Sequence, residues 1–469
     1  MLRNIVLLFL GLVVGMSSFS CTSQKESRMK FTGAKGEVKL MILDPGHFHA
    51  ELVLKKMYDQ VSPVVHVYAP EGPEVEDYIK AINNFNTRSE NPTSWQLKVY
   101  KGADFLEKMI EQKPGNVMIT AGNNRKKTEY LKATVDAGIN VLSDKPMCIN
   151  KQGFELLKEA FSSAEKNHVL LYDIMTERYS ITTVLQKALS EIPDVFGELQ
   201  KGTLENPAVT KESVHHFFKY VAGNPIKRPP WYFDVTQQGE GLVDVTSHLV
   251  DLVQWECFPE QALNYQTDIK MISAKHWPTM ITKAQFTKVT QLPDFPDYLK
   301  AKLNDKGVLP VFSNGEMNYT VKGVHAKVSV VWKFEAEKLT GGTGDTHYSV
   351  MRGTKANIII RQGKEQGFIP ELYVAAAKGA NTKALASALQ AALKNLQTKY
   401  PGLELEKHGK EWHVIIPDKY RLGHEAHFAQ VTQKYLKFLV DGKLPDWEVP
   451  DMIAKYYTTT SALEMALQK

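Results

Sequence analysis

The chain has 469 residues, of which 43% are hydrophobic and 23% charged, so its composition is that of an ordinary globular protein. A chain of this length is expected to fold into about two or three domains. Its formal net charge is only +5 and no basic run stands out, which excludes nucleic acid as an expected partner.

The first residues, MLRNIVLLFLGLVVGMSSFSC, follow the order of an export signal: one Arg, an apolar stretch, small polar residues and then Cys21. The apolar stretch is too short to span a bilayer comfortably. The ending Ser-Phe-Ser-Cys resembles a bacterial lipoprotein cleavage site. We therefore predict a signal peptide at residues 1–20, a lipidated Cys21 and a polar tether at residues 21–36. The protein would be an exported, membrane-anchored lipoprotein, periplasmic or at the cell surface; a secreted protein cut near Ser20 is the alternative.

Only two cysteines follow the N-terminal one, Cys148 and Cys257. Two thiols give neither a disulfide framework nor a cysteine metal cluster. Both lie in apolar stretches, which favours buried and unreactive thiols.

Residues 37–175 alternate short apolar runs with amphipathic stretches. We predict strands at residues 38–44, 64–70, 116–122, 140–146 and 168–175, and helices at residues 49–58, 105–112, 125–138 and 153–167. A polar, Asn-rich stretch at residues 82–94 interrupts the series. Aliphatic strands that alternate with helices are typical of an α/β fold with a doubly wound parallel sheet, so this part is predicted to be a Rossmann-like domain.

After Met175 the pattern changes to longer strand-like segments, at residues 262–274, 316–336 and 356–363. Their alternation predicts a large, open and mostly antiparallel sheet. Helices are predicted at residues 383–399, 425–440 and 450–467. Residues 176–469 are therefore expected to form an α+β domain for substrate binding or oligomerisation, with an addition around residues 365–420.

Two short motifs carry the chemistry. The first is Asp144-Lys145-Pro146, at the end of a predicted parallel strand, where ligands gather in open α/β sheets. The alternative interpretation of this motif is an ordinary surface lysine in a turn. The second motif runs from Gly239 to Trp255 and contains Asp244, His248 and Asp251 at helical spacing. This arrangement suits general acid–base catalysis, and a surface ion pair on a helix is the alternative interpretation.

Together with the strand–helix series before them, these motifs resemble those of the Gfo/Idh/MocA family, the glucose–fructose oxidoreductases and inositol dehydrogenases. That family carries Glu-Lys-Pro, where this chain has Asp-Lys-Pro. It also carries a glycine pair followed by Asp-x-x-x-His, matched here by Gly239, Gly241, Asp244 and His248. The stretch AGINVLSDKPM resembles the family sequence almost position by position, and the resemblance covers most of residues 38–363.

The resemblance implies an NAD(P)-binding domain joined to a domain whose open sheet shapes a sugar site. It implies that Lys145 hydrogen-bonds the reacting hydroxyl, that His248 takes or returns its proton, and that Asp244 positions substrate or His248. An ammonium group in this place also stabilises the alkoxide that forms as hydride leaves.

The family's glycine-rich loop falls on Asp44, Gly46 and His49, so that only the middle glycine is kept. His47 and His49 could offset the charge of Asp44 near a diphosphate. Other cofactor contacts are expected from a carboxylate after the second strand, two asparagines after a later strand and the lysine motif. The predicted cofactor-binding residues are Gly46, His47, Phe48, His49, Glu71, Asn123, Asn124, Asp144 and Lys145. The altered loop leaves the choice between NAD and NADP open.

The sugar pocket is expected to draw on the second domain, because aromatic faces suit sugar rings. The predicted substrate-lining residues are Arg178, Trp231, Tyr232 and His347.

A different interpretation is a Zn²⁺ site at His47 and His49, as in some barrel hydrolases, completed by other histidine clusters. Those clusters are His215-His216, Asp345-x-His347 and His424-Glu425-x-His427. A barrel needs eight βα units, whereas the second half of this chain is rich in strands, so no metal is predicted.

The sequence therefore predicts an NAD(P)-dependent oxidoreductase that acts on a secondary hydroxyl of a sugar or sugar derivative. Outside the cytoplasm no abundant cofactor pool exists, which favours a tightly held cofactor and a redox-neutral cycle. A glycoside hydrolase that acts through a keto-sugar is one alternative, and a catalytically silent sugar-binding lipoprotein is another. The expected partners are a carbohydrate, the membrane through the lipid anchor alone, and, as an option, further copies of the chain.

Overall fold

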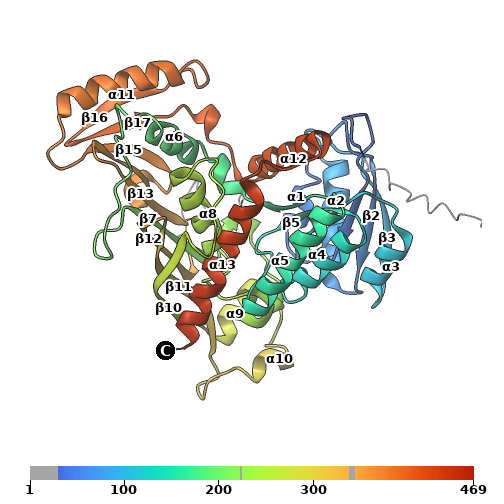
Figure 1. The fold of residues 1–469 in the computed structure, drawn as a ribbon. Helices are drawn as coiled ribbons and strands as arrows, with labels where there is room; N and C mark the ends of the chain where they lie inside the picture. Colours follow the sequence, from blue (N-terminus) through green and yellow to red (C-terminus); the bar gives the residue numbers. More distant parts are fainter. Residues whose placement is uncertain (1–29, 222–223, 337–343, 469) are drawn as a thin grey trace, which may run out of the picture.

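The computed structural model describes residues 30–221, 224–336 and 344–468, which form two α/β units joined by the C-terminal helices (Figure 1). The predicted signal peptide and Cys21 lie outside the described residues, as does the tether up to residue 29.

The first unit is built on a six-stranded parallel sheet with the strand order β3-β2-β1-β4-β5-β6. Its strands are β1 (Leu40–Leu43), β2 (Val64–Ala69), β3 (Gln96–Lys101), β4 (Val117–Thr120), β5 (Asn140–Asp144) and β6 (Leu171–Ile174). Its helices are α1 (His49–Leu52), α2 (Pro73–Thr87), α3 (Phe105–Gln112), α4 (Lys127–Asp136) and α5 (Lys151–Lys166). All residues of β1, β4, β5 and β6 are buried, as expected for strands of a parallel sheet that helices cover on both faces. The predicted Rossmann-like fold is confirmed.

Three elements of this unit differ from the prediction. Two elements were not predicted: helix α2, which includes residues 82–87 of the Asn-rich stretch, and strand β3, which follows that stretch. The sequence of β3 is polar and mostly exposed, because the strand lies at the sheet edge. Helix α1 was expected to reach residue 58 but ends at Leu52. Side chains capture the carbonyls that would continue it: Trp95 Nε1 donates to Leu54 O at 2.6 Å, and Arg88 donates to Lys55 O at 2.7 Å.

The second unit is built on a nine-stranded sheet in the order β10-β11-β12-β7-β13-β14-β15-β17-β16, antiparallel except for the pair β12 and β7. Its strands are β7 (Val209–Phe218), β10 (Ile269–Ile281), β11 (Leu309–Val321), β12 (Val324–Glu335), β13 (Thr346–Arg352), β14 (Ala356–Gln362), β15 (Glu371–Ala376), β16 (Glu404–His408) and β17 (Glu411–Ile415), and the short β8 (Tyr220–Val221) and β9 (Asn224–Pro225) pair separately. The predicted large, mostly antiparallel sheet is confirmed.

The helices of this unit are α6 (Ile181–Ser190), α7 (Val235–Gln238), α8 (Thr246–Cys257), α9 (Lys283–Thr290), α10 (Asp297–Lys300) and α11 (Thr382–Leu396), with 3-10 turns η1 (Thr176–Tyr179), η2 (Pro230–Phe233), η3 (Lys364–Gln366) and η4 (Asp418–Tyr420). Residues 316–336, expected as one strand-like segment, form parts of β11 and β12 instead. The chain reverses at Lys322 and Gly323, which both have positive φ as tight hairpin turns require. The region around residues 365–420, expected to be an addition, extends the sheet by β15, β17 and β16, next to α11.

The last two helices, α12 (His424–Asp441) and α13 (Glu448–Leu467), connect the two units. In Figure 1, α12 lies above the parallel sheet and α13 runs between the units. Phe428 and Tyr435 of α12 and Tyr456 of α13 belong to the same hydrophobic core as β1 and β4, while Ala462 and Leu463 of α13 belong to the core of the second unit. The C-terminus therefore fixes how the two units face each other.

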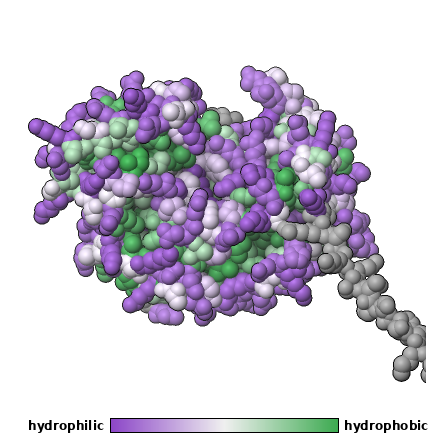
Figure 2. Space-filling view, turned by 45° about the horizontal axis from the view of Figure 1, so that its top comes forward, coloured by the Kyte–Doolittle hydropathy of each residue, from purple (hydrophilic) through white to green (hydrophobic). Residues whose placement is uncertain are grey.

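The face of the molecule in Figure 2 is mainly hydrophilic, with hydrophobic side chains in separate areas. Among the described residues, no helix combines the length and the apolar character that crossing a bilayer requires.

Candidate active site

The two sequence motifs meet at the carboxyl end of β5. Lys145 follows β5 directly, and its Nζ lies 2.7 Å from Oδ1 of Asp244 in the second unit. Asp244 Oδ2 accepts a hydrogen bond from Gln238 Nε2 at 3.1 Å. Burial opposes the charge on Lys145, but the carboxylates of Asp244 and Asp144 raise its pKa above the ordinary value. The site thus holds an ammonium group in its charged form between the two units.

The imidazole of His248 completes this arrangement. Burial, followed by the nearby ammonium of Lys145, lowers the pKa of His248 well below its ordinary value. Its Nδ1 is buried and makes no hydrogen bond to any described residue. A neutral imidazole with an unsatisfied nitrogen beside a charged lysine can accept a proton from a bound hydroxyl group.

The glycines of the second motif allow the start of α8 to lie against the large sheet. A Cβ at Gly241 would overlap the carbonyl oxygen of Ser313 in β11, and Gly239 has a φ of +96°. Asp244 lies in the turn before α8 rather than in the predicted helix, where it can reach Lys145. Asp251 was expected on the same face but points elsewhere, toward Arg178 and Lys455.

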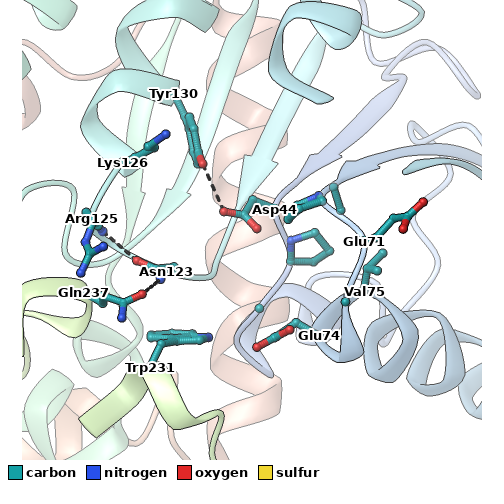
Figure 3. A pocket seen from close by; sticks show the side chains of 15 residues that line it. Asp44, Glu71, Glu74, Val75, Asn123, Arg125, Lys126, Tyr130, Trp231 and Gln237 are labelled. Carbon is teal, nitrogen blue, oxygen red and sulfur yellow. Dashed lines mark hydrogen bonds between the residues drawn. The ribbon is translucent and has the colours of Figure 1, made fainter. Parts of the chain in front are cut away.

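A cavity of about 340 Å³ lies where the loops after β1, β2 and β4 meet the second unit (Figure 3). The predicted cofactor residues Gly46, Glu71 and Asn123 line it, and so does Trp231 from η2. Its other polar lining groups were not among the predicted cofactor-binding residues, although the sequence had placed Asp44 in the phosphate loop. These are Asp44, Glu74, Arg125, Lys126, Tyr130 and Gln237. We refer to this cavity as the dinucleotide cleft.

The position of the cleft and most of its polar side chains suit a bound dinucleotide. Glu71 follows β2, where a carboxylate can accept hydrogen bonds from ribose hydroxyls, and Arg125 and Lys126 bring positive charge (Figure 3). The backbone of the altered loop contributes less than usual, because the N–H groups of Gly46 and His47 both donate to Ala121 O at 3.1 Å. Burial also raises the pKa of Asp44 to about 6, despite the hydroxyl of Tyr130 at 3.4 Å.

Asn124, predicted beside Asn123 as a cofactor contact, lies outside the cleft. Its Nδ2 donates to Gln238 O at 2.7 Å and its backbone N–H donates to Gln237 O at 2.9 Å. It therefore connects the loop after β4 with the segment before α8. Asn123 remains in the cleft, where its Nδ2 donates to Gln237 Oε1 at 2.6 Å.

The histidines of the opening loop turn toward Asp144 rather than toward the cleft. His49 Nδ1 lies 3.1 and 3.0 Å from the two carboxylate oxygens of Asp144, and its Nε2 lies 3.2 Å from Nε2 of His424 in α12. His47 Nδ1 lies 3.8 Å from Asp144 Oδ2. Five further predicted cofactor residues are not among the lining residues of the cleft, so contacts from them to a dinucleotide stay a prediction: His47, Phe48, His49, Asp144 and Lys145.

A second cavity of about 390 Å³ lies on the other side of the loop after β1, against α2 and residues 226–232. His47 and Phe48 line it, together with Tyr232 and Arg228. The guanidinium of Arg228 lies 4.4 Å from the ring of Tyr232, and its Nε donates to Phe217 O at 2.8 Å. Sequence reasoning missed Arg228, although the run Arg-Pro-Pro-Trp-Tyr-Phe marks an aromatic segment next to a cation.

Two predicted substrate residues lie in other surroundings. Arg178 is buried in an ionic network, where its NH2 lies 2.7 Å from Asp251 Oδ1 and its NH1 lies 3.0 Å from Glu448 Oε1, so its donors are already occupied. We therefore correct its assignment from substrate contact to structural ion pair. His347 pairs with Ser213 in the large sheet, and burial, followed by Lys211, lowers its pKa to about 3.

A polar cluster, which the sequence indicated only in part, lies at the end of β7. Asp345 Oδ1 lies 3.0 Å from His216 Nδ1, and Lys219 also pairs with Asp345. Burial raises the pKa of Glu177, whose carboxyl group interacts with Lys145 and Lys219. These polar groups of the second unit therefore extend from the large sheet toward Lys145.

A parallel sheet in this strand order, with a carboxylate after β2 and a lysine at the end of β5, is typical of the Rossmann-like domain of two-domain oxidoreductases. Residues 185–467 match the family model described as "Putative oxidoreductase C terminal domain". The chain belongs to this family.

Solved structures agree with this assignment. A protein from Parabacteroides merdae, described as a "putative oxidoreductase", is 57% identical, with 94% of this chain and all of that chain covered (100%) and a TM-score of 0.91. A levoglucosan dehydrogenase in complex with NADH is 12% identical over 92% of this chain and 97% of its own, with a TM-score of 0.56. GenD2 from gentamicin A biosynthesis, in complex with NAD, is 14% identical over 94% and 96%, with a TM-score of 0.56. At such identities these two show a shared fold. No curated protein matched the sequence.

Proposed function

We propose that the protein is an NAD-dependent oxidoreductase that acts on a hydroxyl group of a sugar or sugar derivative, as in the Gfo/Idh/MocA family. One observation carries the proposal: the ion pair of Lys145 and Asp244 across the two units, beside the buried, unsatisfied Nδ1 of His248. The likeness in fold to a levoglucosan dehydrogenase with NADH supports the cofactor and the substrate class.

The roles of the side chains follow from their charges. NAD, when bound, supplies a two-electron hydride acceptor. Lys145 donates a hydrogen bond to the substrate oxygen and stabilises its negative charge as the C–H bond breaks. His248 is neutral and accepts the hydroxyl proton. Asp244 keeps the ammonium of Lys145 charged and oriented, since it lies only 2.7 Å away.

The cofactor is proposed to be NAD rather than NADP because of Glu71. A carboxylate after the second strand accepts hydrogen bonds from the ribose diol and repels a 2′-phosphate. Gly46 and Asn123 would complete the contacts of the chain in the cleft.

Turnover of Lys145→Ala and His248→Ala on an oxidisable sugar tests the proposed roles. Each variant should lose about 10²-fold or more in kcat, because each removes a group that acts in the transition state. The control is Lys158→Ala, a lysine on α5 that pairs with Glu155 at 2.7 Å on the surface. Wild-type rates in both active-site variants would rule out these roles.

The N-terminal sequence favours a second candidate function. If the protein is exported and anchored through Cys21, as we propose from that sequence, a redox-neutral cycle such as glycoside cleavage through a keto-sugar suits it better than net oxidation. In the loop after β1, the backbone N–H groups of Gly46 and His47 already donate hydrogen bonds within the protein. This favours a third candidate function, a catalytically silent sugar-binding protein. Denaturing the purified protein and identifying released nicotinamide by mass spectrometry separates these cases. Near-stoichiometric NAD(H) supports an enzyme with a resident cofactor, and lipid mass spectrometry of the N-terminal peptide tests the anchor.

A further inference from the structure

Three potential metal ligands converge on one point between the loop after β1 and the end of β5. They are His47, His49 and Asp144, and one ligand atom from each lies within 4.8 Å of the other two. His49 and Asp144 are buried, with 7% and 4% of their surface exposed. The cluster lies between Lys145 and α12, outside the dinucleotide cleft.

Hydrogen bonding accounts for only part of this cluster. His49 Nδ1 can donate to the carboxylate of Asp144, at 3.0 Å from Oδ2. His47 Nδ1 is buried and has no hydrogen-bond partner, although Asp144 Oδ2 lies 3.8 Å away. A buried nitrogen without a partner costs free energy unless something else satisfies it.

The separations suit a shared ion better than a hydrogen-bond network. Metal–ligand bonds of about 2.0–2.1 Å at tetrahedral angles place neighbouring ligand atoms roughly 3.3 Å apart. Asp144 Oδ2 lies 3.0 Å from His49 Nδ1 and 3.8 Å from His47 Nδ1, on either side of that value. Two imidazoles and one carboxylate are a frequent ligand set for first-row divalent ions, and they leave a coordination position open.

The surroundings leave the carboxylate available and orient one imidazole. Lys145 pairs with Asp244, and Lys127 donates to the backbone carbonyl of Asp144 rather than to its side chain. His424 Nε2 lies 3.2 Å from His49 Nε2. With His49 Nδ1 on an ion, its Nε2–H would donate to His424, which is the outer partner that ligating histidines usually have.

We infer that His47, His49 and Asp144 form a binding site for a divalent first-row transition ion, with His424 as the outer partner of His49. The ion would fasten the loop after β1 to the end of β5, one residue from Lys145. The inference rests on these side chains alone and does not depend on the proposed oxidoreductase function.

Titration of the chelator-treated full chain with Zn²⁺ tests the site, with Co²⁺ absorption as a readout of the ligand field. The wild-type protein should bind one Zn²⁺ per chain at this site, and His47→Gln should lose that binding. Because His47 Nδ1 makes no hydrogen bond, this substitution removes no bond on which the fold depends. His424→Gln should weaken binding by about 10–100-fold.

His413→Gln is the matched control, because His413 pairs with Glu371 at 3.0 Å in the distant strands β17 and β15. It should bind Zn²⁺ as the wild type does. Equal Zn²⁺ binding by wild type and His47→Gln, or a wild type without a stoichiometric site, overturns the inference. Neither result bears on the released-nicotinamide measurement, so the two proposals fail separately.

Discussion

Glu71 shows how one carboxylate can set cofactor choice. It lies at the end of β2 and lines the dinucleotide cleft (Figure 3). Glu71→Gln removes the charge but keeps the shape, so NAD affinity should fall by roughly 10–100-fold, the value of one charged hydrogen bond. The affinity for NADP should rise relative to the affinity for NAD. Calorimetric titration with both cofactors measures the change.

Glu76→Gln on α2, just after the loop that holds Glu71, is the control, since Glu76 pairs with Lys101 and does not line the cleft. It should leave both affinities unchanged. A Glu71→Gln variant with the wild-type preference would contradict this role of the carboxylate.

Asp44 should make both stability and cofactor binding depend on pH. Burial raises its pKa to about 6, from the ordinary value of 3.8. Below about pH 3.8 the carboxyl group is protonated in the folded and unfolded states alike, so it does not change the free energy of unfolding. As the pH rises to about 6, only the unfolded state loses this proton. The free energy of unfolding therefore falls by up to about 3 kcal/mol over this pH range.

Asp44→Asn should therefore stabilise the protein above pH 6 and have no effect near pH 3.5, as measured by urea unfolding at several pH values. Asparagine also tolerates the positive φ of 48° at this position. Cofactor affinity in the wild type should fall above pH 6, and the variant should lack this fall. The exposed Asp59 gives the control Asp59→Asn. Equal stability gains at both ends of the pH range would argue against a titrating Asp44.

At the scale of elements, Gly241 determines how closely α8 can approach the large sheet. In Gly241→Ala the new methyl group would overlap the carbonyl of Ser313, so the turn that holds Asp244 must move. We expect a loss of about 1–3 kcal/mol in unfolding free energy and a lower kcat, because Asp244 would no longer face Lys145 correctly. Gly363→Ala is the control, since its Cβ would meet only Gln366 Oε1 at 3.5 Å. Unfolding curves and turnover of both variants give the comparison.

The elements also show what the sequence could and could not predict. The buried strands β1, β4, β5 and β6 were predicted because short runs of apolar residues between helical segments mark them in the sequence. Strand β3 was missed because an edge strand needs no such run. Lys145 and Asp244 were predicted from local motifs. The contact of His424 with His49 was not, because it joins residues 375 positions apart and depends on how α12 folds back.

The whole molecule depends on buried charges that bring α13 against both units. Lys455 Nζ lies 2.7 Å from Asp173 Oδ2 at the end of the parallel sheet and 2.9 Å from Asp251 Oδ1 in α8. Arg178 binds the same Asp251 and also Glu448. Burial alone would raise the pKa of Asp251, but Arg178 and Lys455 hold it below the ordinary value. A lowered carboxyl pKa contributes stability above the ordinary value that is lost as the pH falls below it.

Lys455→Met keeps the length of the side chain but leaves Asp173 and Asp251 without one of their cations. Removal of one partner from a buried ion pair typically costs about 3–5 kcal/mol, and here the cost falls on a helix that belongs to both hydrophobic cores. We therefore expect both units to lose stability together, with one unfolding transition at a lower denaturant concentration. Lys437→Met on α12, whose partner Asp441 lies 2.6 Å away on the surface, should cost less than about 1 kcal/mol. Denaturant unfolding followed by tryptophan fluorescence and circular dichroism measures both variants. An unfolding midpoint of Lys455→Met equal to that of the wild type would contradict this role of the buried charges.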